Sequence, residues 1–203
     1  MSEIKPLVLA SNNKGKLAEL EALMAPLGFQ LITQSSLGVT EAEEPFHTFV
    51  ENALAKARHA SLLTQLPALA DDAGLCVDAF NGAPGVQTAF YATQFGYAKG
   101  DDNNVKALLE QMAGLDNRRA ALVSTLVAVK HPEDPEPLIA VGRASGQITK
   151  APQGQHGFGF DPVMWMPTFG KTFAELDPQI KNQHSHRGQA ARLMCEMMKE
   201  RWL

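Results

Sequence analysis

The sequence is short of several features that mark specialised proteins. Its 203 residues contain two cysteines, Cys76 and Cys195, which form neither a disulfide framework nor a paired metal-binding motif and are typical of a reducing compartment. The apolar run near the N-terminus covers only residues 7–10 and is too short for a signal peptide. No stretch approaches the ~20 apolar residues of a membrane span. We therefore expect a cytoplasmic protein that does not enter the membrane.

Positive charge is also scarce. The 18 Lys and Arg residues are outnumbered by 22 Asp and Glu residues, and the net charge of −4 removes any general attraction to nucleic acid, so we predict no nucleic-acid partner. A small anionic substrate needs only a local positive pocket and is compatible with this balance. With 45% apolar and 20% charged residues, the composition is that of an ordinary globular protein. We see no internal repeat and no long linker, and we predict a single domain over residues 1–203.

The order of the apolar segments predicts an α/β fold with a mixed sheet. Residues 118–130 and 137–150 predict two long strands, joined by a proline-rich connection that has little to bury. We expect Pro45 to open one helix, and Asp102 or Asn103 to lie near the N-cap of another. Shorter strands are expected at residues 6–10, 29–33 and on both sides of residues 71–72, and helices at 14–27, about 46–65, 101–115 and near the C-terminus.

A polar turn, Ser11 to Asn13, follows the first strand and leads into a helix start that contains Lys14, Gly15 and Lys16. Free N–H groups at a helix start, with lysines nearby, favour a phosphate. The turn is not a Walker A loop, because the leading glycines and the Lys-Ser/Thr pair are missing. A plain Ser/Asn cap with solvated lysines explains the same residues. Both interpretations stay open at this point.

Two adjacent carboxylates, Asp71 and Asp72, stand at the predicted end of a buried strand. Neighbouring residues in a strand point to opposite faces, so one carboxylate can enter a cleft while the other braces the loop. Mg²⁺ prefers such oxygens together with substrate phosphates. A turn that begins with Asp before Gly74 is an equally good explanation.

Two further segments carry weaker signals. Residues 41–45 place several glutamates before a helix, where carboxylates are common for dipole reasons alone. The glycine-rich residues 154–162 contain Phe158 and Phe160, either of which could stack on a nucleobase. An ordinary flexible loop would have the same composition.

His186 and Arg187 lie at a predicted helix start, where cations oppose the helix dipole. This placement implies a compensating anion or hydrogen-bond acceptor, and Lys181 lies a few residues earlier. A solvated basic face is the alternative.

Six segments occur along the chain in this order: "SNNKGK", "FVENALAKARHA", "LADDAGL", "GAPGV", "GFGFDP" and "SHRGQA". Their order resembles the inosine triphosphate pyrophosphatase family, and within it the bacterial members that hydrolyse non-standard purine nucleoside triphosphates. The resemblance extends from Leu7 to the final helix. It implies an α/β fold with two lobes around a long central mixed β-sheet flanked by helices, with the active site in the cleft between the lobes, and usually a homodimer.

The resemblance also implies a reaction: ITP, dITP and XTP are hydrolysed with Mg²⁺ to the monophosphate and pyrophosphate, which cleanses the nucleotide pool. Asp72 matches the proton acceptor, and Glu44 and Asp72 match the metal ligands. The remaining matched positions would bind the substrate: Ser11, Asn12, Asn13, Lys14, Gly15, Lys16, Ala73, Phe158, Gly159, Phe160, Asp161, Lys181, His186 and Arg187.

Three positions depart from the family pattern. Ala73 stands where Ser or Thr is frequent, Phe160 replaces a common Tyr, and Phe90 stands where many bacterial members carry Arg. We assign no role to Phe90. The basic side chains of Lys181, His186 and Arg187 are rich in hydrogen-bond donors. These donors would suit the 6-oxygen of inosine or xanthosine, whereas the 6-amino group of adenosine would leave them unpaired.

Two other functions fit parts of the same pattern. One is a related pyrophosphatase that prefers modified pyrimidine or other nucleotides, against which the "SHRG" segment argues. The other is a nucleotide-binding regulator without turnover, which would not need the acidic pair formed by Glu44 and Asp72.

Overall fold

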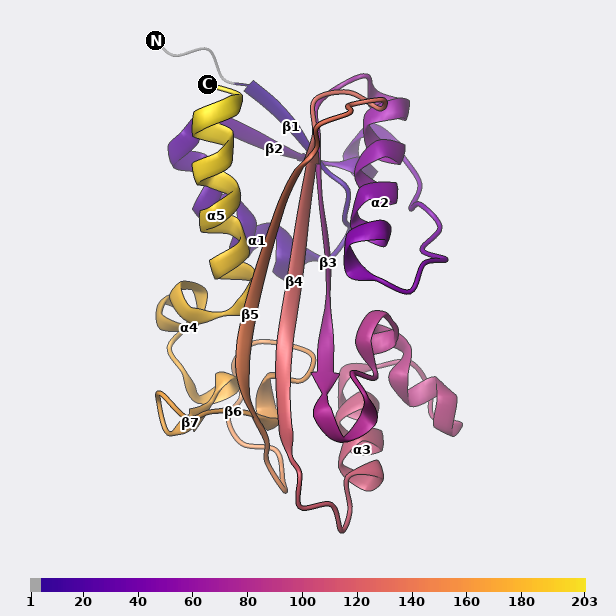
Figure 1. Cartoon of the computed structure of the whole chain (residues 1–203), viewed down its shortest axis with the longest axis vertical. Coiled ribbons are helices and arrows are strands. Elements are labelled where there is room, and N and C mark those ends of the chain that lie inside the picture. The colour runs from indigo at the N-terminus through magenta and orange to yellow at the C-terminus, as the bar shows by residue number, and fades with distance from the viewer. Residues whose placement is uncertain (1–4) are drawn as a thin grey trace. The chain divides into compact units, whose positions relative to one another are not determined.

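The computed structural model describes residues 5–203, without the side chains of Lys14 and Glu19. These residues form a seven-stranded sheet in the order β2-β1-β3-β4-β5-β6-β7 (Figure 1). The pairs β1–β2 and β1–β3 are parallel, whereas β5–β6 and β6–β7 are antiparallel, which confirms the predicted mixed α/β sheet. The strands are β1 (Lys5–Leu9), β2 (Phe29–Thr33), β3 (Ala68–Val77), β4 (Arg119–Val129), β5 (Leu138–Ile148), β6 (Met164–Met166) and β7 (Lys171–Thr172). The α-helices are α1 (Lys14–Met24), α2 (Phe49–Thr64), α3 (Asp101–Gln111), α4 (Pro178–His184) and α5 (His186–Arg201).

The chain divides into two compact units, each assembled from separate segments. The first unit contains the chain up to Asp72 together with Ser124–Gly142 and His186–Leu203. The second contains Ala73–Val123 and Arg143–Ser185. The two units agree with the two-lobed expectation, while the placement of the active site in a cleft between lobes stays a prediction.

Within the first unit, helices cover both faces of the strands (Figure 1). Leu9 of β1 and Leu69 of β3 lie in a buried cluster with side chains of α1 and α5. Val8 and Ala70 lie in a second buried cluster with alanines of α2. Because side chains alternate along a strand, odd-numbered residues in this part of β3 face α1 and α5, and even-numbered residues face α2.

The second unit has a core of its own. Leu75 and Val77 of β3 pack there with Leu108 of α3 and with Phe160 and Phe173. Phe160 is only 3% exposed. None of the helices in the described residues is long and apolar enough to cross a membrane.

Strand β3 differs from the sequence prediction. Residues 68–77 form one continuous strand, so the two aspartates lie in its middle rather than at its end. The small residues Ala73 and Gly74 continue the extended backbone instead of turning it. In β3, the residues that pair with β1 are Ala68 and Leu69. The aspartates therefore lie just beyond the part of β3 that is paired with β1.

The structure also corrects one predicted helix start and one predicted N-cap. Helix α2 begins at Phe49 rather than at Pro45, because Thr48 caps it and its side chain accepts the N–H of Glu51. Helix α3 begins at Asp101, in agreement with the predicted range, but its N-cap is Gly100, whereas Asp102 and Asn103 lie within the first turn.

The connection between β4 and β5 buries more than its composition suggests. Asp134 is 5% exposed, and its two carboxylate oxygens accept the N–H groups of Lys130 and Glu136, both at 2.9 Å. Residues 131, 133, 135 and 136 are exposed, so the expectation that this segment has little to bury holds except for Asp134, whose carboxylate accepts two backbone N–H groups of the turn.

Candidate active site

The turn between β1 and α1 is organised by Asn13. Its side-chain oxygen accepts the N–H groups of Gly15 at 2.9 Å and Lys16 at 3.2 Å, and its own N–H donates to Ser11 Oγ. Asn12 donates to Glu41 at 3.0 Å. The interpretation of this segment as a helix cap is thus confirmed, while its contact with phosphate stays a prediction. The side chain of Lys14 lies outside the described part of the chain.

Asp71 lies on the α1 and α5 side of β3, as the strand alternation requires. Its Oδ2 is 2.9 Å from Lys16 Nζ of α1 and 3.1 Å from Arg187 Nε of α5. Its Oδ1 accepts a 2.6 Å hydrogen bond from Ser124 Oγ of β4. The carboxylate is 1% exposed and is held by two cations and a hydroxyl. The anion that the helix-start position of Arg187 implied is therefore Asp71.

These partners determine the acidity of Asp71. Burial alone would raise the pKa of this carboxyl group, but the charges of Lys16 and Arg187 and the Ser124 hydrogen bond outweigh burial. The pKa of Asp71 is therefore held well below its usual range, and the group is ionised at neutral pH.

A close backbone approach positions Arg187. A Cβ atom on Gly142 of β5 would lie 1.9 Å from the carbonyl oxygen of His186 and 2.7 Å from the backbone nitrogen of Ala190. Only glycine allows the first turn of α5 to come this near to β5. His186 and Arg187 are both buried at this helix start.

Asp72 lies on the opposite side of β3, toward α2. Its Oδ1 is 3.2 Å from Lys56 Nζ, and the same ammonium is 2.8 Å from Glu44 Oε2. The Oδ2 atom of Asp72 is buried and has no hydrogen-bond partner in the described part of the chain. Lys56 thus bridges the two carboxylates that the resemblance matches to metal ligands, and it leaves one oxygen of Asp72 unpaired.

The pKa values of Asp72 and Lys56 are both raised. Burial, and then the neighbouring charge of Glu44, raise the pKa of Asp72, and the opposing effect of Lys56 does not cancel them. Burial would lower the pKa of Lys56, but the charges of Asp72 and Glu44 outweigh it and raise this pKa. Asp72 is therefore a stronger base than an ordinary carboxylate.

A separate polar group lies in the second unit. Asp161 is 3% exposed, and its Oδ2 is 2.8 Å from Lys181 Nζ and accepts the N–H of Phe158 at 2.9 Å. The Lys181 ammonium lies 4.9 Å from the centre of the Phe158 ring. The structure thus brings Phe158, Asp161 and Lys181 together, with the Phe158 ring partly exposed.

Phe160 does not take part in this group. Its ring is packed in the core of the second unit, so it offers no surface for a base, and the prediction of stacking by Phe160 is wrong. The stacking prediction stays with Phe158. Ala73, the next residue of β3 after Asp72, is partly exposed.

The sequence prediction missed Lys56 and Ser124. Lys56 lies next to Ala57 and three residues after Ala53, and both alanines are fully buried. A charged residue at the edge of an apolar helical stripe could therefore have indicated that Lys56 takes part in the site. Ser124 and Thr125 interrupt an otherwise apolar strand in the same way.

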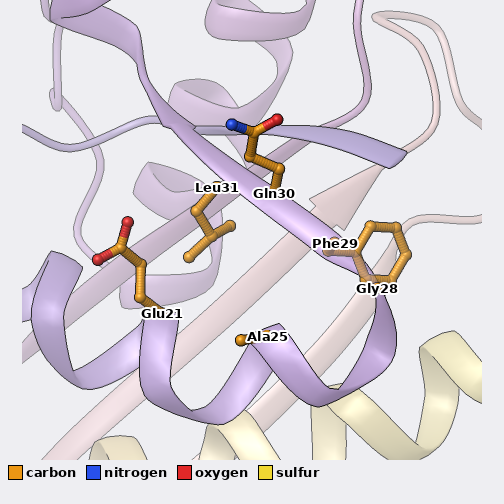
Figure 2. A pocket seen from close by; sticks show the side chains of 6 residues that line it. All are labelled: Glu21, Ala25, Gly28, Phe29, Gln30 and Leu31. Atoms are coloured by element: carbon orange, nitrogen blue, oxygen red, sulfur yellow. The ribbon is translucent and has the colours of Figure 1, made fainter. Parts of the chain in front are cut away.

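A surface hollow lies elsewhere in the first unit, between α1 and the edge strand β2 (Figure 2). It contains none of the predicted site residues, so its shape carries no support for the active site. Its lining consists of Glu21, Ala25, Gly28, Phe29, Gln30 and Leu31.

The chain matches a known family over nearly its whole length. The model of the Ham1 family matches residues 7–197. A dITP/XTP pyrophosphatase from Acidovorax sp. (strain JS42) is 74% identical over 196 residues, which cover 97% of this chain and 96% of that protein. A dITP/XTP pyrophosphatase from Albidiferax ferrireducens is 74% identical over 197 residues, with 97% and 99% coverage.

Solved structures are similar as well. A HAM1 protein from Coxiella burnetii has a TM-score of 0.90 and 42% identity, over 97% of this chain and 99% of that one. A nucleoside-triphosphatase / dITP/XTP pyrophosphatase from Mycobacterium abscessus has a TM-score of 0.74 and 37% identity, over 95% and 99% of the two chains.

Proposed function

This chain belongs to the Ham1 family, and from that premise we propose that it hydrolyses ITP, dITP and XTP to the monophosphate and pyrophosphate, and so cleanses the nucleotide pool. The names of its relatives support this substrate class. The observation that carries the chemistry is Asp72, a buried carboxylate with a raised pKa and one oxygen that has no hydrogen-bond partner among the described residues.

We propose Mg²⁺ as the cofactor. Among residues 5–203, no group of three or more His, Cys, Asp or Glu side chains could hold a metal without other ligands. Mg²⁺ usually keeps several waters and is bound through one or two carboxylates and substrate phosphates, so a two-carboxylate set suits it. Glu44 and Asp72 form such a set, and the unpaired Oδ2 of Asp72 is an oxygen available to a ligand. The ion would offset the negative charge of the triphosphate.

Asp72 is the group best suited to accept a proton from the attacking water. Water adds to the α-phosphorus, the bond from that phosphorus to the oxygen bridging to the β-phosphorus breaks, and pyrophosphate leaves with the electron pair. The raised pKa of Asp72 favours the transfer of the water proton to its carboxylate. Lys56, which is 3.2 Å from Asp72, supplies a positive charge beside the reacting phosphate.

We propose that the triphosphate binds along the start of α1, where Ser11 to Lys16 offer backbone N–H groups and lysines. Asp71 holds the Lys16 ammonium at 2.9 Å and so fixes one of these positive charges. The nucleoside binds at Phe158 and Lys181: the ring stacks on the base and the ammonium donates to the purine 6-oxygen. His186 and Arg187 supply further donors, as the resemblance implies.

We also propose that the protein works as a homodimer in the cytoplasm. The support for the dimer is the family resemblance alone. Two observations support the cytoplasm: the proposed substrates belong to the nucleotide pool, and both cysteines are free thiols, as is usual in a reducing compartment.

A pyrophosphate-release assay across a nucleotide panel, with Mg²⁺ and with the metal chelated, tests these assignments together. We expect release from ITP, dITP and XTP to exceed release from ATP and GTP, and to require the metal. Preference for a modified pyrimidine triphosphate would favour the related pyrophosphatases instead. Tight binding of ITP without pyrophosphate release would identify a nucleotide-binding regulator.

A further inference from the structure

The loop that carries Phe158 is fixed by a carboxylate from the same segment of the chain. Asp161 accepts the Phe158 N–H and pairs with Lys181, as described above. A Cβ atom on Gly157 would lie 2.0 Å from the same carboxylate oxygen, so the backbone of the loop lies directly against Asp161. One carboxylate therefore contacts residues 157, 158 and 181.

Gly159 is anchored by a residue from far along the sequence. Its backbone N–H donates a 2.7 Å hydrogen bond to Oδ2 of Asp101, which is 58 residues away in the chain. Gly159 has a φ of +62°, a conformation that side-chain-bearing residues rarely adopt, and this backbone turn presents its N–H to Asp101. Apart from Gly159 and its two chain neighbours, no described residue has an atom within 4 Å of a Cβ built there, so conformation rather than crowding is the reason for glycine at this position.

Asp101 is well placed for this contact. It is the first residue of α3, whose N-terminus favours a negative charge. Helix α3 is itself fixed, because Val105 and Leu108 are buried in the core of the second unit. The carboxylate therefore connects the loop to a helix that is held by the core.

Taking from the proposed function that Phe158 and Lys181 hold the nucleoside, we infer that Asp101 is a positioning residue that fixes the nucleoside-binding loop together with Asp161. The two carboxylates anchor consecutive backbone N–H groups, those of Phe158 and Gly159. With both anchors in place, the Phe158 ring is ordered before the base arrives, and less conformational entropy is lost on binding. Asp101 contacts the backbone of the loop and is not among the residues proposed to bind the triphosphate, so we expect an effect on nucleoside affinity and not on the chemical step.

Three variants distinguish positioning of the loop by Asp101 from a general effect of negative charge at the start of α3. Asp101→Ala removes the acceptor, and Asp101→Asn keeps an acceptor oxygen without the charge. Asp102→Ala is the matched control, because Asp102 is also an exposed acidic residue in the first turn of α3. Each variant is assayed for ITP turnover and, by calorimetry, for binding of inosine monophosphate and of pyrophosphate.

We expect Asp101→Ala to raise KM for ITP and to weaken inosine monophosphate binding by roughly 5- to 10-fold, the size of losing one charge-assisted hydrogen bond at an exposed site. We expect kcat to stay within about twofold and pyrophosphate affinity to be unchanged, because positioning acts on the nucleoside alone. Asp101→Asn should recover most of the loss, and Asp102→Ala should behave as wild type.

Three results would overturn the role of Asp101: equal behaviour of Asp101→Ala and Asp102→Ala, equal damage from Asp101→Asn and Asp101→Ala, or equal weakening of inosine monophosphate and pyrophosphate. A wild-type protein that releases no pyrophosphate from ITP would instead overturn the proposed function, and with it the nucleoside role of the loop. The wild-type measurement in the same series therefore distinguishes the two failures.

Discussion

Asp71 and Asp72 are neighbours in β3, yet their side chains lie on opposite sides of the strand and have different partners. Asp71 faces α1 and α5, and Asp72 faces α2. On the first side, the carboxylate of Asp71 has two cations and a hydroxyl as partners, and its pKa is lowered. On the second side, Asp72 shares the single ammonium of Lys56 with Glu44, and its pKa is raised. Both carboxylates are buried, so burial alone does not separate them.

The difference shows which carboxylate is free to react. A carboxylate that is saturated with charged partners is a weak base and is difficult to displace, so Asp71 is suited to holding Lys16 and Arg187 in place. A carboxylate with an unpaired oxygen and a raised pKa is ready to take up a proton or a ligand. The alternation of side chains in one strand thus assigns two different roles to two identical residues.

The largest expected effect comes from Asp71→Asn. The substitution removes the negative charge opposite two cations, and breaking a buried ion pair costs about 3–5 kcal/mol. We expect the free energy of unfolding, measured by urea denaturation, to fall by that amount, and turnover to fall with it. An Asp71→Asn protein with wild-type stability would show that the two sides of β3 do not differ as described.

Asp72→Asn should affect activity and spare the fold. It keeps the shape of the side chain but removes its basicity, and the loss of a general base costs roughly 10²-fold or more in kcat. Circular dichroism and the melting temperature should stay near wild type, because the raised pKa of Asp72 means that its charge is not favoured in the folded state. Turnover close to wild type would exclude Asp72 as the proton acceptor.

The two aspartates should respond to acid with opposite sign. The pKa of Asp71 is lowered by folding, so its contribution to stability is complete above its usual pKa of about 4 and is lost as the pH falls below that value. The pKa of Asp72 is raised, so the folded state takes up its proton first and gains stability as the pH falls toward about 4.

Unfolding free energies between about pH 3 and 7 test this contrast. Below about pH 4, the free energy of unfolding of Asp71→Asn should fall less steeply than that of the wild type. As the pH falls from 7 toward about 4, Asp72→Asn should not show the increase in stability that Asp72 gives the wild type. Parallel curves for all three proteins would contradict the assigned pKa directions.

Ser124→Ala is expected to have the smallest effect. It removes the hydroxyl that donates to Asp71 but leaves both cations, so we expect a loss of about 1–2 kcal/mol, typical of a hydrogen bond to a charged group. The acid midpoint of unfolding should move to higher pH, because the Ser124 bond helps to lower the pKa of Asp71. Ser145→Ala, at an exposed position of β5, is the control and should change neither quantity.

Much of this arrangement could be predicted from the sequence, and the reasons differ by residue. The helices, the long strands, and the opposite orientations of Asp71 and Asp72 follow from local periodicity, and the need for an anion at Arg187 follows from the helix dipole. The identity of that anion does not follow, because Asp71 and Arg187 are 116 residues apart and only the folded chain brings them together.

Other errors have local causes. Phe160 matched a nucleoside-binding pattern, but a pattern does not distinguish a ring that faces solvent from one that faces the core. An aspartate shortly before Gly74 suggested a turn, yet this segment is extended within β3. The connection that holds Asp134 was expected to have little to bury, and its composition did not indicate that this one carboxylate accepts the N–H groups of Lys130 and Glu136.

The discontinuous make-up of the two units has a consequence for the biosynthesis of the protein. The chain passes from one unit to the other after residues 72, 123, 142 and 185, and each passage adjoins Asp72, Ser124, Gly142 or His186. The ribosome therefore delivers Asp71 early and its partner Arg187 more than a hundred residues later. A nascent or truncated chain that ends before α5 cannot complete the ion pairs of Asp71, and such a chain stays open to proteases and chaperones until almost the whole sequence has emerged.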